Sequence, residues 1–199
     1  MTAEAPPPTS TPSGPPPTPK PTNTPRPTDT PIPTATPIPM LALPFTDDFN
    51  DGLDPAWTVT QGNALIDDGR LTASTDRLYI RLDDKLPESY AIDFDYDNLS
   101  VYEPLWIIFS NRLLFFATTW EAGWKIYDSG KWDRMSDFTE PDFDQFSGHA
   151  RLEVSGNRYT LYINGFPADE LIYGQQLNDS LTISILEGDF IDNFTITPN

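Results

Sequence analysis

Hydrophobic and polar residues alternate strictly over residues 91–97, with the two-residue period of a β-strand. The apolar positions fall on one side of this strand and are Ile92, Phe94 and Tyr96. The opposite side carries acidic residues, which we interpret as facing solvent: Asp93, Asp95 and Asp97. One face of the strand is therefore expected to be buried and the other to be exposed.

Further alternation and turn residues predict a series of antiparallel strands in the C-terminal half of the chain. Residues 149–155 and 159–163 alternate on either side of Ser155-Gly156-Asn157, which predicts a hairpin. Asn164-Gly165 then supplies the two residues with positive φ that a type I′ turn requires. Residues 181–197 alternate again and predict the closing strands.

Two stretches are apolar throughout instead of alternating. Residues 105–109 and 113–117 have the continuous hydrophobicity that is typical of strands covered on both faces. No window keeps a helical period for three turns. The sequence therefore predicts an all-β sandwich of two antiparallel sheets.

The composition changes abruptly between Pro44 and Phe45. Residues 1–44 hold sixteen of the 22 prolines and no aromatic residue, whereas all 25 aromatic residues follow the break. Alternating proline and threonine withholds backbone donors and favours polyproline II, so this segment cannot pack a core. We expect residues 1–44 to be a disordered Pro/Thr-rich linker and residues 45–199 to be one folded domain.

The charge is as uneven as the proline content. The four charged residues of the linker cancel, so the formal net charge of −18 belongs to residues 45–199. Such a domain should repel nucleic acid and anionic lipid, because binding to polyanions depends on basic residues. The absence of cysteine excludes disulfides and thiolate chemistry. No apolar run is long enough to span a membrane.

The linker resembles the proline-threonine linkers of secreted and surface-anchored bacterial proteins. That resemblance implies an extracellular or cell-surface location. The first residues have neither a basic region nor an apolar core of a signal peptide, so the export signal or anchor is expected to be missing from this chain.

Four short motifs carry a further resemblance. They are an F-x-D-x-F strand with a tryptophan in residues 45–57, Asp68-Gly69-Arg70-Leu71, Tyr162-Ile163-Asn164-Gly165 and Ile191-Asp192-Asn193-Phe194. Together they resemble concanavalin A-like jelly rolls, including laminin-G-like and 3-keto-disaccharide hydrolase-like domains, over most of residues 45–198. In such folds the first and last strands pair.

That pairing would bring oxygen-bearing side chains together at one place. The candidate ligands of a structural calcium ion are Asp47, Asp48, Asn50, Asp189 and Asp192, because calcium prefers six to eight oxygen ligands. The spacing misses that of an EF-hand, since Phe49 occupies a ligand position. The alternative is that these residues make turn and cap hydrogen bonds.

No catalytic residue is assigned. Laminarinase-like relatives use a Glu-x-Asp-x-(x)-Glu strand, and the nearest stretch, residues 187–192, lacks its second glutamate. The single histidine, His149, has no triad context and is interpreted as a surface residue at a strand start. A hydrolase remains the alternative, with candidate acids among Glu103, Glu121, Asp128 and Glu187.

An aromatic-rich run between residues 106 and 146 offers a place for sugar to stack. The candidate ligand-binding residues are Trp120, Trp124, Tyr127, Trp132 and Arg134. Trp124 and Trp132 flank a turn-like Asp128-Ser129-Gly130 and are expected to form the exposed pair. The alternative is that most of these rings pack in the core.

The sequence thus predicts a non-catalytic extracellular module that binds carbohydrate or another surface and is displayed on a Pro/Thr tether. A glycoside or 3-keto-disaccharide hydrolase-like enzyme and a structural domain that contacts envelope proteins are the alternatives. A glycan or surface polysaccharide is the expected partner, and nucleic acid and direct membrane insertion are not expected.

Overall fold

The computed structural model describes residues 14–15, 38–99, 105–118, 122–128, 130–138 and 147–199, with backbone alone for 134–138. The compact unit runs from Pro37 to Asn199. The expected disordered linker, residues 1–44, lies largely outside the described residues. Within the described part of the chain there is no helix, and so none long and apolar enough to cross a membrane.

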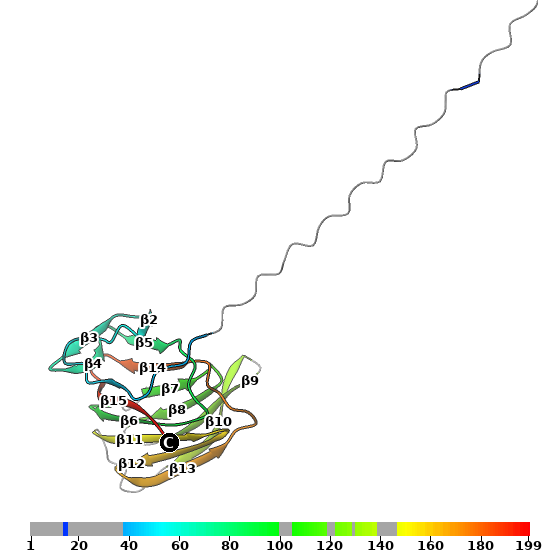
Figure 1. Cartoon of the computed structure of the whole chain (residues 1–199). Coiled ribbons are helices and arrows are strands. Elements are labelled where there is room, and N and C mark those ends of the chain that lie inside the picture. Colours follow the sequence, from blue (N-terminus) through cyan, green and yellow to red (C-terminus); the bar gives the residue numbers. More distant parts are fainter. Residues whose placement is uncertain (1–13, 16–37, 100–104, 119–121, 129, 139–146) are drawn as a thin grey trace, which may run out of the picture. The chain divides into compact units, whose positions relative to one another are not determined.

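Two antiparallel sheets pack face to face, as the alternation predicted (Figure 1). The order in the first sheet is β13 (Phe166–Ile172), β12 (Arg158–Ile163), β11 (Gly148–Ser155), β6 (Ser89–Asp97), β15 (Phe190–Pro198), β4 (Arg70–Ala73) and β3 (Ala64–Asp67), with β1 (Phe45–Asp47) also paired to β15. The order in the second sheet is β10 (Lys131–Phe138), β9 (Ala122–Asp128), β8 (Leu113–Ala117), β7 (Leu105–Phe109), β14 (Leu181–Leu186), β5 (Arg77–Leu82) and β2 (Trp57–Gln61). We call them the eight-stranded and the seven-stranded sheet. The all-β sandwich is confirmed.

The predicted inward positions form the core between the sheets. Ile92 and Phe94 of β6 are fully buried, and Tyr96 is 2% exposed. The expected hairpin is β11 and β12, paired from Ala150 to Ser155. Asn164 and Gly165 have φ of 51° and 81°, as the predicted type I′ turn requires.

The continuously apolar strands β7 and β8 are covered on both faces, also as predicted. Phe109 and Phe115 face the core between the sheets. On the outer face of the seven-stranded sheet, Ile108, Leu114 and Phe116 form a second, smaller cluster that is also buried. Burial on both faces explains why polar residues do not interrupt these strands.

The first and last strands pair, as the family resemblance implied. Phe45 of β1 lies opposite Ile196 of β15 in an antiparallel register. Beside this pair the ring of Trp57 packs edge-on against Phe45 at 5.8 Å and against Phe194 at 5.3 Å between centroids. The two chain segments are therefore fixed by rings as well as by backbone hydrogen bonds.

The compact unit begins several residues before the break in composition. Leu41 N–H donates to the carbonyl of Lys85 at 2.9 Å, and Lys85 N–H donates to the carbonyl of Pro39 at 2.8 Å. The Leu41 side chain is 7% exposed and belongs to the core. A short apolar stretch, Met40-Leu41-Ala42-Leu43, thus docks on the sandwich although its proline-rich context suggested a linker.

Truncation at two points should separate linker from domain. A chain that begins at Pro37 should melt as the full chain does. A chain that begins at Phe45 loses the burial of Leu41 and both backbone hydrogen bonds, so its free energy of unfolding should fall by about 2 kcal/mol. Thermal and urea melts measure the difference, and equal stability of the two truncated chains would show that residues 37–44 contribute nothing.

Candidate functional site

Two of the predicted sugar-stacking rings meet on the β9–β10 hairpin. Trp132 of β10 lies directly opposite Tyr127 of β9, and their ring centroids are 5.2 Å apart. Tyr127 is 46% exposed, whereas Trp132 is partly buried against the outer cluster of the seven-stranded sheet. The exposed aromatic surface on this hairpin is therefore centred on Tyr127.

The expected exposure of Trp124 is wrong. Its side chain is fully buried and packs against the rings of Phe109, Phe115 and Tyr159, with centroids 5.3 to 6.4 Å apart along the cluster. Residues 124 and 127 are an odd number of positions apart, so they point to opposite faces of β9. A ring enclosed between the sheets cannot stack on a sugar.

The other predicted residues of this set are only partly described. Trp120 lies outside the described residues, and the same holds for the side chain of Arg134. The backbone of Arg134 is paired with Lys125 of β9.

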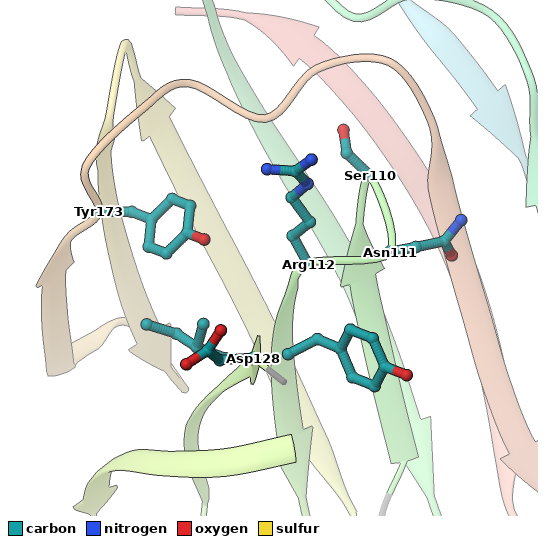
Figure 2. Close-up of a pocket in the computed structure, with 7 residues that line it drawn as sticks. Ser110, Asn111, Arg112, Asp128 and Tyr173 are labelled. Atoms are coloured by element: carbon teal, nitrogen blue, oxygen red, sulfur yellow. The ribbon is translucent and has the colours of Figure 1, made fainter. Parts of the chain in front are cut away.

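A cavity lies next to Tyr127. It has a volume of about 530 Å³ and is lined by Ser110, Asn111, Arg112, Ile126, Tyr127, Asp128 and Tyr173. We call it the hairpin pocket. Figure 2 shows the Arg112 side chain rising between Tyr173 and Ser110, with the Asn111 side chain directed away from it. A cavity of this size suits a small ligand.

A tight turn builds one wall of the hairpin pocket. Ser110 and Asn111 have φ of 47° and 55°, and Arg112 N–H donates to the carbonyl of Phe109 at 2.9 Å. These are the features of a type I′ turn, which joins β7 to β8. Serine and asparagine are less distinctive turn residues than Asn-Gly, so the turn was not predicted from the sequence.

Hydrogen bonds fix this turn to neighbouring chain segments. Ser110 N–H donates to the carbonyl of Ser180 at 2.9 Å, and Asp179 N–H donates to Ser110 Oγ at 3.0 Å. Tyr127 N–H donates to the carbonyl of Arg112 at 2.8 Å. The pocket wall is therefore held from the β13–β14 connection and from β9.

Tyr173 is held in place from the eight-stranded sheet. Its N–H donates to the carbonyl of Asn157 at 2.8 Å, and its own carbonyl accepts from Asn157 Nδ2 at 2.7 Å. The ring of Tyr173 also packs against the core, as does Ile126. The apolar side of the pocket is thus rigid, and the polar groups of Arg112 and Asp128 are exposed above it.

Sequence reasoning found Tyr127 but missed Arg112 and Tyr173 as parts of a site. They lie 61 positions apart and come from different sheets, so no local pattern joins them. Asp128 was named as a turn residue and as a candidate acid of a hydrolase, and among the described residues it is the one carboxylate that lines the hairpin pocket. Of the other candidate acids, Glu187 does not line it, and Glu103 and Glu121 lie outside the described residues.

Asp47, a predicted calcium ligand, instead serves as a hydrogen-bond acceptor for the opening loop. Its side chain is 4% exposed; Oδ1 accepts from Phe49 N–H, and Oδ2 accepts from Asp54 N–H and Trp57 Nε1, all within 3.0 Å. Burial raises the pKa of this carboxyl above its usual value, although the three donors favour its charged form.

The remaining predicted metal ligands also take part in local structure. Asp48 accepts from Asn50 N–H at 3.1 Å, and Asp192 accepts from Asn193 N–H at 2.7 Å. Asp189 is buried at 2% exposure. Among the described residues no group of three or more acidic or histidine side chains is arranged to hold a metal ion. The turn and cap alternative accounts for these contacts, and calcium binding stays a prediction.

The aspartates of β6 are paired, where the sequence suggested that they are merely solvated. Asp93 Oδ2 lies 2.7 Å from Arg151, and Asp97 Oδ2 lies 2.8 Å from Arg70. His149, a strand-start residue as predicted, has its ring nitrogens 2.8 Å from Asp95 Oδ1 and 3.3 Å from Asp93 Oδ1. Opposite charges thus alternate across the outer face of the eight-stranded sheet.

No protein-family model matches the chain, and no curated protein matches its sequence. Solved structures do match its fold. Carbohydrate-binding module CBM66 from Bacillus subtilis is 11% identical, with 71% of this chain and 95% of the module covered and a TM-score of 0.55. A β-glucanase from Bacillus licheniformis is 9% identical, with 78% and 98% covered and a TM-score of 0.60.

A third similar structure is the exoplasmic/lumenal domain of VIP36, in a form with Ca²⁺ and Man3GlcNAc bound. It is 10% identical, with 77% of this chain and 88% of that domain covered and a TM-score of 0.59. At such low identity the likeness concerns the fold alone. The chain has a concanavalin A-like jelly-roll fold, as the motifs implied.

The role of Asp47 can be tested by Asp47→Asn. One acceptor oxygen becomes an NH₂ group, so at least one buried donor loses its partner, and the free energy of unfolding should fall by about 1–3 kcal/mol. The exposed Asp51 of the same loop is the matched control, because Asp51→Asn removes the same charge and should have little effect.

Thermal melts of the wild type in EDTA and in calcium chloride complete this test. A melting temperature that is equal in both would remove the calcium prediction and leave the acceptor role. A lower melting temperature in EDTA, absent in Asp47→Asn, would show that Asp47 helps to hold a metal ion.

Proposed function

We propose that the sandwich is a glycan-binding module and that the hairpin pocket is its site. The observation that carries this proposal is the combination of exposed and fixed groups around one cavity: Tyr127 and Tyr173 as rings, with Arg112 and Asp128 as polar neighbours. A sugar ring needs an aromatic face for its C–H groups and directional partners for its hydroxyls. The pocket offers both kinds of group.

The polar groups differ in what they can do for a sugar. Arg112 can only donate hydrogen bonds, and Asp128, when ionised, can only accept them. A sugar hydroxyl can both donate and accept, so adjacent hydroxyls can satisfy the two side chains together. Because the surrounding backbone is fixed by hydrogen bonds, the site loses little conformational entropy when a ligand binds.

The structural comparisons support the same proposal at the level of the fold. The similar structures include a carbohydrate-binding module and a lectin-like domain with Man3GlcNAc bound. A β-glucanase shares the fold as well, so the fold does not decide between binding and catalysis. We propose binding without catalysis because Asp128 is the one carboxylate that lines the pocket among the residues that the structure describes, whereas glycosidases use two.

Extracellular display on the Pro/Thr segment belongs to the same proposal. An extended linker of this composition would hold a binding module away from a surface. The acidic excess, at a net charge of −18, suits a solvated surface and gives no attraction to anionic membranes.

Glycan binding can be measured on an oligosaccharide array and then by calorimetry. The wild type should bind at least one oligosaccharide, and Tyr127→Ala should weaken binding by about tenfold, because the exposed stacking ring is lost. Phe166→Ala is the matched control: Phe166 is 75% exposed but lies on β13 of the other sheet. Its removal should leave binding unchanged.

A folded wild type that binds nothing on the array would contradict the proposal and favour the alternative of an envelope-protein partner. Equal losses in Tyr127→Ala and Phe166→Ala would contradict the assignment of the pocket.

Display can be tested on intact cells that produce the protein. An antibody against the sandwich should label the cells without permeabilisation, and added protease should remove that label. A cytoplasmic protein is the internal control. Labelling that requires permeabilisation would contradict display.

A further inference from the structure

Arg112 differs from every other arginine whose side chain the structure describes. Arg70, Arg81, Arg151 and Arg158 each form an ion pair with a carboxylate at 2.6 to 2.9 Å. The guanidinium of Arg77 lies over the ring of Trp106, 4.3 Å from its centroid, and donates to Ser184 Oγ at 3.0 Å.

The Arg112 side chain makes no ion pair, hydrogen bond or ring contact with any described residue, although it lines a pocket that also contains Asp128. In a chain with 30 acidic and 12 basic residues, a solvent-facing arginine that is not paired with a carboxylate is unusual. Its five N–H donors are available to a ligand.

The hairpin pocket adjoins the less acidic face of the molecule. Along the outer face of the seven-stranded sheet, the side chains described at strand positions include no carboxylate. They include the cations Arg77, Arg81 and Lys125, of which Arg81 is paired with Asp83 directly after β5, and aromatic rings such as Tyr79, Trp106 and Trp132. Tyr127 lies on this face, at the edge of the pocket.

The opposite outer face carries several carboxylates at strand positions instead. The outer face of the eight-stranded sheet carries Asp93, Asp95, Asp97, Glu153, Glu170 and Asp192. Exposed charges that are separated by more than about 8 Å are largely screened at physiological salt. These carboxylates belong to the sheet opposite the one that carries Arg112, and the carboxylate that lines the pocket among the described residues is Asp128.

We propose that the hairpin pocket binds an acidic sugar, with the sugar's carboxylate on Arg112, a hydroxyl on Asp128 and the ring against Tyr127. This inference rests on the proposed glycan-binding function and names the ligand class of the same pocket.

A guanidinium matches a carboxylate with two parallel N–H···O bonds, which a neutral hydroxymethyl group cannot accept in the same way. Asp128 then determines how the sugar is oriented in the pocket, because its carboxylate repels the acid group of the sugar and accepts a hydrogen bond from a sugar hydroxyl. A uronic acid unit carries both groups on one ring. The neighbouring charges therefore suit an acidic sugar better than a neutral sugar.

Matched pairs of trisaccharides provide the test. Each pair shares linkage and ring stereochemistry and differs only at C6, which is a hydroxymethyl group or a carboxylate: β-1,4-linked glucose and glucuronate, β-1,4-linked mannose and mannuronate, and α-1,4-linked galactose and galacturonate. Binding to the full chain is measured by calorimetry or by chemical-shift titration. At least one acidic trisaccharide should bind about tenfold more tightly than its neutral twin.

Arg112→Gln should weaken binding of the acidic trisaccharide more than binding of its neutral twin, and so remove that preference. Arg158→Gln is the matched control, because it removes the same charge from the other sheet and should keep the preference. Added salt should weaken binding of the acidic trisaccharide alone. Since the Arg112 side chain makes no ion pair or hydrogen bond with a described residue, Arg112→Gln should melt as the wild type does.

The outcomes separate the two proposals. Neutral and acidic twins bound equally tightly, or an acidic preference that survives Arg112→Gln, would overturn this inference and leave glycan binding intact. No binding of any trisaccharide or array glycan would overturn both.

Discussion

The pairing of the last strand inside the eight-stranded sheet is the constraint on which the rest of the structure depends. β15 lies against β6 along most of its length and also pairs with β1 and β4, so it joins the two ends of the folded unit at the middle of the sheet. Phe194 points from β15 into the core beside Phe45, Trp57 and Phe94. Asp47 holds the loop that follows β1 through the Trp57 indole. Without β15 the sheet would divide into two parts, and the β11–β13 side, which carries Tyr173, would lose its connection to β1.

Much of this architecture could be predicted from the sequence, because it depends on local periodicity. The alternation in β6 and the turns beside β12 assign faces and hairpins without knowledge of the partner strands. The site could not be predicted in the same way. Trp124 and Trp132 both flank a turn, and this position does not say which face of the strand each ring occupies. The answer follows from the register, which turns Trp124 toward Tyr159 and Trp132 toward Tyr127.

The hairpin pocket was missed for a different reason. It consists of side chains that are ordinary by themselves: an arginine after a turn, a tyrosine in a connection and an aspartate at a strand end. Only the sandwich brings the end of the β7–β8 hairpin to the segment after β13, and the hydrogen bonds at Ser110 and Asn157 then fix both sides. Long-range topology, which the sequence pattern does not encode locally, therefore creates the site.

The distribution of charge within the fold changes what composition implies. An overall charge of −18 argued against anionic partners as long as the charge was treated as uniform. The β-sandwich places strand side chains alternately on the inner and outer faces, and each outer face belongs to one sheet. On one outer face carboxylates lie beside arginines, which balance their charge at short range. On the other, aromatic rings lie among cations, and Arg112 at the pocket is available to a negatively charged group although the molecule as a whole is strongly acidic. At physiological salt, only charged groups within about 8 Å of the ligand interact with it strongly. The electrostatic contribution to binding therefore depends on Arg112 and its near neighbours more than on the net charge of the molecule.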